Sequence, residues 1–209
     1  MVNKKIMLSE FTLLLAHGAG ADKDSEWMVN FSLAVEALGI KVVRFNFPYM
    51  DKSVKDGKRR PPDRMPKLQE AFIAQIEKLS LDARHIIIGG KSMGGRVASL
   101  IAAEPDRQSV AGVVCLGFPF TPPGKPEQFR GEHLKSIQVP TLIIQGERDK
   151  FGGHEQVEQY EFSEQVSYVI LQDGDHSFVP RVRSGVTLQE NIQRAVKSIG
   201  KFIETSVAS

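Results

Sequence analysis

The chain has 209 residues, of which 41% are hydrophobic, with a mean hydropathy of −0.20 and a formal net charge of +2 at pH 7. This length suits one α/β domain with a full core, so we expect residues 1–209 to form a single domain. The small net charge gives no reason to expect nucleic acid or an anionic membrane as a partner.

Apolar runs and helical spacings alternate along the chain. Runs that are bounded by Gly, Pro or polar residues predict strands, and apolar residues three or four apart predict helices. In chain order we expect a strand at 11–16, a helix over 28–38, a strand at 41–45, a helix over 68–79, a strand at 85–89, a helix over 96–103, strands at 110–116 and 139–145, a helix over 157–162, a strand at 166–171 and a helix over 188–202. The polar, basic stretch 51–66 and the Pro-rich stretch 117–132 are expected to be loops.

Strands that are apolar on both faces and alternate with helices are typical of a parallel sheet that is covered on both sides. The pattern therefore predicts an α/β fold, a three-layer α/β/α sandwich around a mostly parallel sheet of about six strands. Ligands bind beyond the carboxyl ends of the strands in such sheets, so every loop that follows a strand is a candidate for the site.

The stretch 90–94, which reads Gly-Lys-Ser-Met-Gly, follows a buried strand and precedes a helix. In this context Gly-x-Ser-x-Gly is typical of a nucleophile elbow, a sharp turn that exposes the hydroxyl of Ser92 above the sheet. A phosphate-binding loop is excluded because His85 stands where that motif needs glycine. The glycines in 18–20 also fail the dinucleotide fingerprint, because Lys23 occupies its last glycine position.

A serine hydroxyl is a weak nucleophile and needs an adjacent base that a third group orients. The predicted base is His176, which lies in the loop after the last strand, at the carboxyl edge of the sheet and late in the chain. His85 opens a strand at the opposite edge, and His17 precedes a glycine turn. His133 follows the Pro-rich stretch, and His154 stands at the start of a helix.

The predicted acid is Asp149, in the loop after the fifth strand. Its carboxylate would accept the imidazole N–H, fix the tautomer and stabilise the imidazolium. Glu147, Asp173 and Asp175 are the alternatives, and the last two are less favourable because they lie so close in sequence to His176.

The order Ser92, Asp149, His176, each after a predicted parallel strand, resembles the α/β-hydrolase fold superfamily over residues 11–203. The resemblance implies that the backbone N–H groups of Met93 and Ala19 form the oxyanion hole, with Gly20 as the alternative to Ala19. It also implies a structural role for the histidine at position 17, which would hold the oxyanion loop.

Within the superfamily, stretches 90–96 and 117–126 are similar to a smaller branch of largely uncharacterised bacterial hydrolases. That branch includes the hydrolase-like part of a subunit of the non-specific-lethal chromatin acetyltransferase complex, and a testis-expressed relative. A more distant similarity is to dienelactone hydrolases, which use Cys where this chain has Ser92. Only about ten residues precede the first strand and stretch 117–134 is short, so we expect neither the usual leading antiparallel strands nor a large cap.

Together these features predict a serine hydrolase that cleaves a small carboxylic ester or thioester through an acyl-enzyme, with no cofactor and no metal. The alternative is a hydrolase-fold protein-interaction module with little or no catalysis, as the chromatin-complex relative suggests. The basic stretch Lys52–Arg64 follows the second strand, where it either attracts an anionic substrate group or forms a solvated loop. Substrate specificity is expected in loops 51–66, 117–134 and 177–186.

The single cysteine, Cys115, excludes an internal disulfide and lies in an apolar run, where we expect an inert core thiol. Only Ile6–Leu8 follow the two N-terminal lysines, which is too short for the core of a signal peptide. No apolar run approaches the ~18 residues of a membrane span. A cytoplasmic location is therefore expected.

Overall fold

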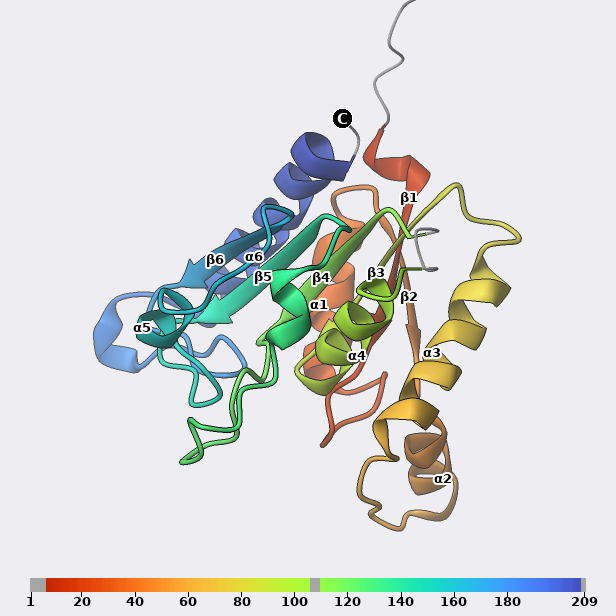
Figure 1. The fold of residues 1–209 in the computed structure, drawn as a ribbon, viewed down its shortest axis with the longest axis horizontal. Helices are drawn as coiled ribbons and strands as arrows, with labels where there is room; N and C mark the ends of the chain where they lie inside the picture. Colours follow the sequence, from red (N-terminus) through yellow and green to blue (C-terminus); the bar gives the residue numbers. More distant parts are fainter. Residues whose placement is uncertain (1–6, 106–109, 208–209) are drawn as a thin grey trace, which may run out of the picture.

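The computed structural model, which describes residues 7–105 and 110–207, contains a six-stranded sheet in the order β2-β1-β3-β4-β5-β6 (Figure 1). Every neighbouring pair is parallel, which confirms the predicted sheet. The strands are β1 (Phe11–Ala16), β2 (Lys41–Phe45), β3 (His85–Lys91), β4 (Gly112–Leu116), β5 (Thr141–Gly146) and β6 (Val166–Leu171).

Helices cover both faces of the sheet, as the alternating pattern predicts. In Figure 1, α1 and α6 lie behind the sheet and α3 and α4 lie in front of it. The buried side chains accordingly form two clusters, one on each face. The helices are α1 (Glu26–Glu36), α2 (Pro48–Asp56), α3 (Met65–Leu79), α4 (Met93–Ala102), α5 (His154–Val157) and α6 (Leu188–Phe202).

The strand order changes direction between β1 and β3. From β1 the chain moves outward to β2, and then returns across β1 to build β3 to β6 on the other side. Ala16 at the end of β1 is in register with Gly90 near the end of β3. The loops that leave these two strands therefore meet at the switch point, where open α/β sheets bind their ligands.

The stretch 51–66, expected to be a loop, begins inside a helix. Pro48 starts α2 at a position where its missing N–H costs nothing, and Gly57 ends it with a φ of 70°. The helix carries few apolar residues, so its spacing is hard to recognise in the sequence. The loop is therefore shorter than expected and is fixed at both ends by helices.

The helix expected over 157–162 is wrong, because α5 already ends at Val157. Beyond it, Tyr160 and Phe162 turn inward and contact the ring of Phe120, at centroid distances of 4.9 and 6.0 Å. Apolar spacing alone does not distinguish such a cluster from a helix face.

The segment after β4 is irregular apart from a 3₁₀ turn at Glu132–Lys135, and the structure shows no large cap over the sheet edge in the described ranges. Cys115 is fully buried in β4, as expected, and burial raises the pKa of its thiol to about 12. None of the helices in 7–105 and 110–207 has the length and apolar character needed to cross a membrane.

Candidate active site

Ser92 stands between β3 and α4 with a φ of 51° and a ψ of −114°, in a region that L-residues rarely adopt. Such a conformation costs about 1–3 kcal/mol and persists only where the surroundings hold it. The backbone N–H of Ser92 donates to the carbonyl of Leu116 in β4 at 2.8 Å, which ties the turn to the next strand. The predicted elbow is therefore present, with the serine at its tip.

The glycines on either side of the elbow are required by close backbone contacts. A Cβ at Gly90 would lie 2.5 Å from the carbonyl carbon of Gly94, and a Cβ at Gly94 would lie 2.6 Å from the carbonyl oxygen of Ala16. Any side chain at either position would push α4 away from β1 and β3.

The structure brings the three predicted side chains together. His176 Nε2 lies 2.9 Å from Ser92 Oγ, and His176 Nδ1 lies 2.7 Å from Asp149 Oδ2. A carboxylate can only accept, so Nδ1 carries the proton and Nε2 is free to accept from the serine hydroxyl. The Asp149 side chain is completely buried, whereas that of His176 is 26% exposed, so the pair is open to solvent on the imidazole side.

Asp149 is held in place by its own loop and by Gln145. The amide of Gln145 donates to Asp149 Oδ2 at 2.8 Å, and the backbone N–H of Phe151 donates to Oδ1 at 2.8 Å. Gln145 also accepts from the backbone N–H of Phe118 at 2.8 Å. This glutamine was not among the predicted site residues, although a polar residue directly after the apolar run Leu142–Ile144 is a signal for one.

The three alternative carboxylates bond to groups of the loops and not to the imidazole of His176. Asp173 pairs with the guanidinium groups of Arg181 and Arg148, and the hydrogen bond to Arg181 holds the pKa of this carboxyl at about 2. Asp175 accepts the backbone N–H groups of residues 177 and 179, and Glu147 accepts that of Asp173.

His17 is fully buried, and burial lowers its pKa, so the imidazole is neutral near pH 7. Its Nδ1 lies 2.6 Å from the carbonyl of Gly18, and its Nε2 accepts the backbone N–H of Phe47 at 3.1 Å. The ring therefore joins the loop after β1 to the loop after β2, which matches the structural role that the resemblance implies.

His133 and His154 bond to groups other than Ser92 and Asp149. The first is within 2.8 Å of Ser99 Oγ, and the second pairs with Glu158 at 2.9 Å. These contacts indicate that both histidines have local structural roles.

Lys91 also lines the site, although its position in the sequence did not indicate this. Its ammonium group is buried beneath the loop that carries His176, donates a hydrogen bond to the carbonyl of His176 and lies 5.5 Å from the ring centre of Trp27. Burial lowers the pKa of Lys91 to about 8. Two neutral donors hold the next carbonyls: Trp27 donates to Ser177 at 3.1 Å and Asn191 to Phe178 at 2.9 Å.

A cavity of about 300 Å³ opens in front of Ser92 and His176. Trp27, Met28 and Phe151 give it mainly apolar walls, and the Phe151 ring centre lies 4.4 Å from that of His176. The loop 18–21 forms another wall, and a Cβ at Gly18 would be 3.6 Å from that of Ser92. This is room for a small organic group beside the serine hydroxyl.

The resemblance implies an oxyanion hole made by two backbone N–H groups, those of Met93 and Ala19, and both residues lie near Ser92. Met93 is the first residue of α4, so its N–H has no acceptor from a preceding turn of that helix. Ala19 lies in the exposed loop beside the serine. Among the described residues, no three His, Cys, Asp or Glu side chains converge as metal ligands.

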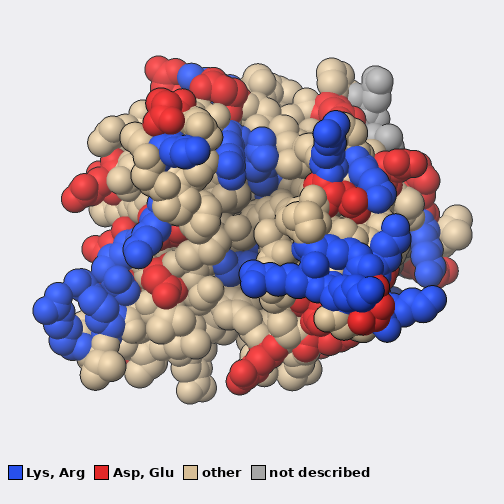
Figure 2. Space-filling view, turned by 90° about the horizontal axis from the view of Figure 1, so that it is seen from below, with Lys and Arg blue, Asp and Glu red and all other residues tan. Residues whose placement is uncertain are grey.

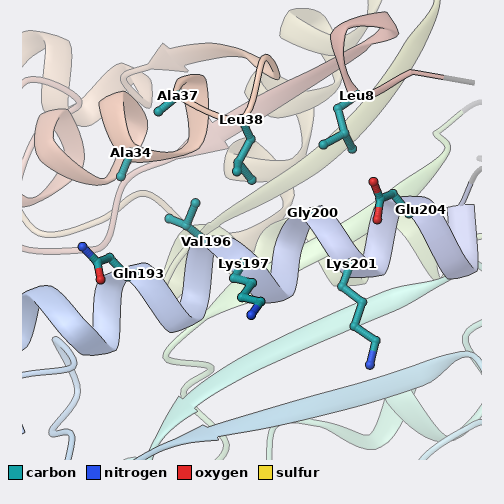
Figure 3. Close-up of a pocket in the computed structure, with 10 residues that line it drawn as sticks. All are labelled: Leu8, Ala34, Ala37, Leu38, Gln193, Val196, Lys197, Gly200, Lys201 and Glu204. Atoms are coloured by element: carbon teal, nitrogen blue, oxygen red, sulfur yellow. The ribbon is translucent and has the colours of Figure 1, made fainter.

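A larger cavity of about 680 Å³ lies elsewhere, between α1 and α6 (Figure 3). Leu8, Leu38 and Val196 point into it, and Lys197 and Lys201 point away. It holds no serine, cysteine or histidine, so the chemistry that the sequence predicts belongs to the smaller cavity at the elbow.

Solved structures of known proteins share this fold. An alpha-beta serine hydrolase homologue from Coxiella burnetii aligns with a TM-score of 0.69 at 19% identity, over 94% of this chain and 86% of that one. Est1E from Butyrivibrio proteoclasticus with ferulic acid bound aligns with a TM-score of 0.69 at 14% identity, over 95% and 90%. A dienelactone hydrolase from Anabaena variabilis gives 0.64 at 18% identity, over 94% and 86%.

These identities establish a common fold, and the sequence establishes the family. The family described as alpha/beta hydrolase domain matches residues 9–204, which include all six strands, the elbow and the loops of Asp149 and His176. The chain therefore belongs to the alpha/beta hydrolase domain family.

Proposed function

We propose that the protein is a serine hydrolase that cleaves a small carboxylic ester or thioester. The observation that carries the proposal is the hydrogen-bonded series Ser92–His176–Asp149, with distances of 2.9 and 2.7 Å, at the edge of the sheet where ligands bind. The mainly apolar cavity of about 300 Å³ beside Ser92 supports a small substrate.

In the proposed mechanism, Ser92 Oγ attacks the substrate carbonyl carbon while His176 Nε2 takes the hydroxyl proton. The oxygen of the tetrahedral intermediate accepts hydrogen bonds from the backbone N–H groups of Met93 and Ala19. Each such donor is typically worth about 2.7–4 kcal/mol of transition-state stabilisation. Asp149 stabilises the imidazolium, which then protonates the leaving alcohol or thiol as the carbon–oxygen or carbon–sulfur bond breaks.

The acyl-enzyme is cleaved by water in the reverse sense. His176 takes a proton from the water molecule, the resulting oxygen attacks the acyl carbon, and the proton passes to Ser92 as the acid is released. The buried Asp149 and its two donors keep the imidazole in one orientation through both steps.

The test combines turnover of p-nitrophenyl acetate with labelling by a fluorophosphonate. We expect the wild-type protein to hydrolyse the ester and to take the label on Ser92, and Ser92→Ala to lose both. Ser198→Ala is the matched control, because its hydroxyl lies on α6 and, in 7–105 and 110–207, bonds to the carbonyl of Arg194 alone. A folded Ser92→Ala variant that keeps wild-type turnover would contradict the mechanism.

The alternative function is a protein-interaction module, as the resemblance to a chromatin-complex subunit suggests. A pure binding module does not need three side chains in hydrogen-bonding order around a strained serine, so the geometry favours catalysis. A folded sample that resists every serine-directed phosphonate and captures a stable partner in a pull-down would favour the module instead.

A further inference from the structure

A second cavity, of about 580 Å³, lies next to the one that contains Ser92. Its walls are α2, through Met50 and Ser53, and the segment that follows, through Arg59 and Arg60. Ala19 and Gly20 line both cavities, so the proposed oxyanion loop forms the ridge between them. The two cavities are therefore neighbours, and the loop of Ala19 and Gly20 is common to both.

The two arginines of this cavity differ in their partners. The guanidinium of Arg60 donates to both carboxylate oxygens of Asp56, at 2.6 and 2.5 Å, and to the carbonyl of Lys58. Arg59 is exposed, and within residues 7–105 and 110–207 its side chain has no hydrogen bond or ion pair. The guanidinium of Arg59 is therefore a cation at the wall of a cavity, and its N–H donors are available to a ligand.

The surroundings of Arg59 are also positively charged. In Figure 2, which views the molecule from below, Lys and Arg side chains gather over α2 and the segment after it, with fewer acidic side chains among them. Stretch 52–64 carries six cations against two carboxylates, at positions 56 and 63. The cavity thus lies in a positive field that raises the local concentration of anions.

The basic wall is fixed relative to the proposed oxyanion loop. The hydroxyl of Tyr49 in α2 donates to the carbonyl of Ala19 at 3.2 Å, and Phe47 is tied to His17. Pro61 and Pro62 follow the two arginines and restrict the backbone there. The backbone that carries Arg59 is therefore held between α2, which is tied to the loop after β1, and two prolines.

We propose that the natural ester or thioester carries a carboxylate on one side of the scissile bond, and that this carboxylate binds Arg59. The inference rests on the proposed hydrolase function and extends it to a substrate class. The apolar part occupies the cavity of Trp27 and Met28, and the charged part occupies the cavity of Arg59. A guanidinium matches a carboxylate with two parallel N–H donors, which makes Arg59 specific for a planar anion.

Two pairs of esters test the proposal, each comparing a carboxylate with its methyl ester. In 4-acetoxybenzoate and methyl 4-acetoxybenzoate the charge is on the leaving group. In the mono-p-nitrophenyl ester of glutaric acid and p-nitrophenyl methyl glutarate it is on the acyl group. For each pair we measure kcat/KM of the carboxylate ester and of its methyl ester and take the ratio of the two values. Comparing this ratio between protein variants cancels the difference in intrinsic reactivity between the two esters.

We expect Arg59→Gln to lower that ratio roughly tenfold for one of the two pairs, because a charge-assisted hydrogen bond is lost. Arg59→Glu should lower it further. Arg64→Gln is the matched control: it removes the same charge from the same exposed stretch, but Arg64 does not line the cavity, so the ratio should stay within about twofold of the wild-type ratio. Raising NaCl from about 0.05 M to about 0.5 M should weaken the wild-type preference.

Each remaining outcome bears on a different claim. Wild-type turnover of the neutral esters with identical ratios in Arg59→Gln and Arg64→Gln would overturn the carboxylate site and leave the hydrolase mechanism standing. Failure of the wild-type protein to turn over any of the four esters or to take a phosphonate label would overturn both. An equal decrease of the carboxylate-to-neutral ratio in Arg59→Gln and Arg64→Gln would show that the preference comes from the overall positive charge of the basic stretch. That result would overturn a specific role for Arg59.

Discussion

Two neighbouring residues, Lys91 and Ser92, carry features that oppose folding. Ser92 has a positive φ without being glycine, and Lys91 places an ammonium group where burial disfavours its charge. Lys91 ends β3 and Ser92 follows it directly, close to the loop of His176. Such local costs are common at functional sites, where the required geometry and the most stable geometry differ.

Removing the charge of Lys91 should lower activity and raise stability. The ammonium holds the carbonyl of His176, so we expect Lys91→Met to lower kcat for p-nitrophenyl acetate by roughly tenfold, the effect of about one lost charged hydrogen bond. The same variant removes a buried charge, so its free energy of unfolding at pH 7 should exceed that of the wild type by about 1–3 kcal/mol.

The pH dependence distinguishes this account from simple repacking. The pKa of Lys91 is about 8 in the folded protein against an ordinary 10.5, with Asp149 and Asp175 as the charged groups that favour the ammonium. The unfolded wild-type chain therefore binds more protons between these values, and wild-type stability rises as pH increases from 8 to 10.5 relative to the variant. Urea unfolding at pH 7, 9 and 10 measures the difference, and a gap that stays constant across this range would contradict the assignment.

At the scale of elements, the elbow depends on how closely α4 approaches β1. Gly94 lies in the first turn of α4, and an added Cβ would come within 2.6 and 2.8 Å of two backbone carbonyl oxygens. The first oxygen belongs to Ala16, the last residue of β1, and the second to His17, which follows it. A strand in the middle of a sheet cannot move away to relieve these contacts. We therefore expect Gly94→Ala to displace the serine and lower kcat more than about 100-fold, with a stability loss of about 1–3 kcal/mol from overpacking.

Gly200→Ala is a matched control for that change. Gly200 is also helical and buried, but the nearest atom to its added Cβ is the terminal Cδ1 of Leu38 at 3.2 Å, which can rotate away. Alanine is more favourable than glycine in a helix interior, and this gain should offset the cost of the small contact with Leu38. Both kcat and the free energy of unfolding should therefore stay near the wild-type values. Equal effects of the two substitutions on p-nitrophenyl acetate turnover would show that the close packing at Gly94 is not needed for the elbow.

The sheet edge could be predicted from the sequence because each residue of the proposed triad follows an apolar strand by a few positions. Parallel strands bring their carboxyl ends together, so chain order alone places Ser92, Asp149 and His176 at one edge. What supports them could not be predicted in the same way. Gln145 and Lys91 bond across strands and loops, and such contacts depend on register and burial that no local pattern encodes.

Short elements were the other failure of prediction, for a related reason. The helix α2 has few apolar residues, and α5 has a single turn. Their positions are set by tertiary contacts, such as the bond from Tyr49 to Ala19, rather than by a repeating pattern. The same contacts fix the basic segment beside the site.

For the whole molecule, one sheet separates two hydrophobic clusters that share no helix. Trp27, the only tryptophan of the chain, packs in the cluster of α1 and α6, with its ring stacked on Phe31 at 5.0 Å. Phe72 belongs to the opposite cluster and is fully buried between α3 and the sheet. Tryptophan fluorescence therefore reports on one face of the sheet, whereas far-UV circular dichroism reports on the backbone of both.

If the chain unfolds as one cooperative unit, a substitution that destabilises one cluster also lowers the urea concentration at which the other cluster unfolds. We expect Phe72→Ala to reduce the free energy of unfolding by about 3–5 kcal/mol, and to shift the urea midpoints of Trp27 fluorescence and of circular dichroism together. Leu81→Ala is the control, because this side chain is 83% exposed and its loss should change stability by less than about 0.5 kcal/mol. Loss of the dichroism signal at lower urea than the fluorescence signal would show that the α3–α4 face unfolds on its own, because the sheet would then couple the two clusters too weakly to make one unit.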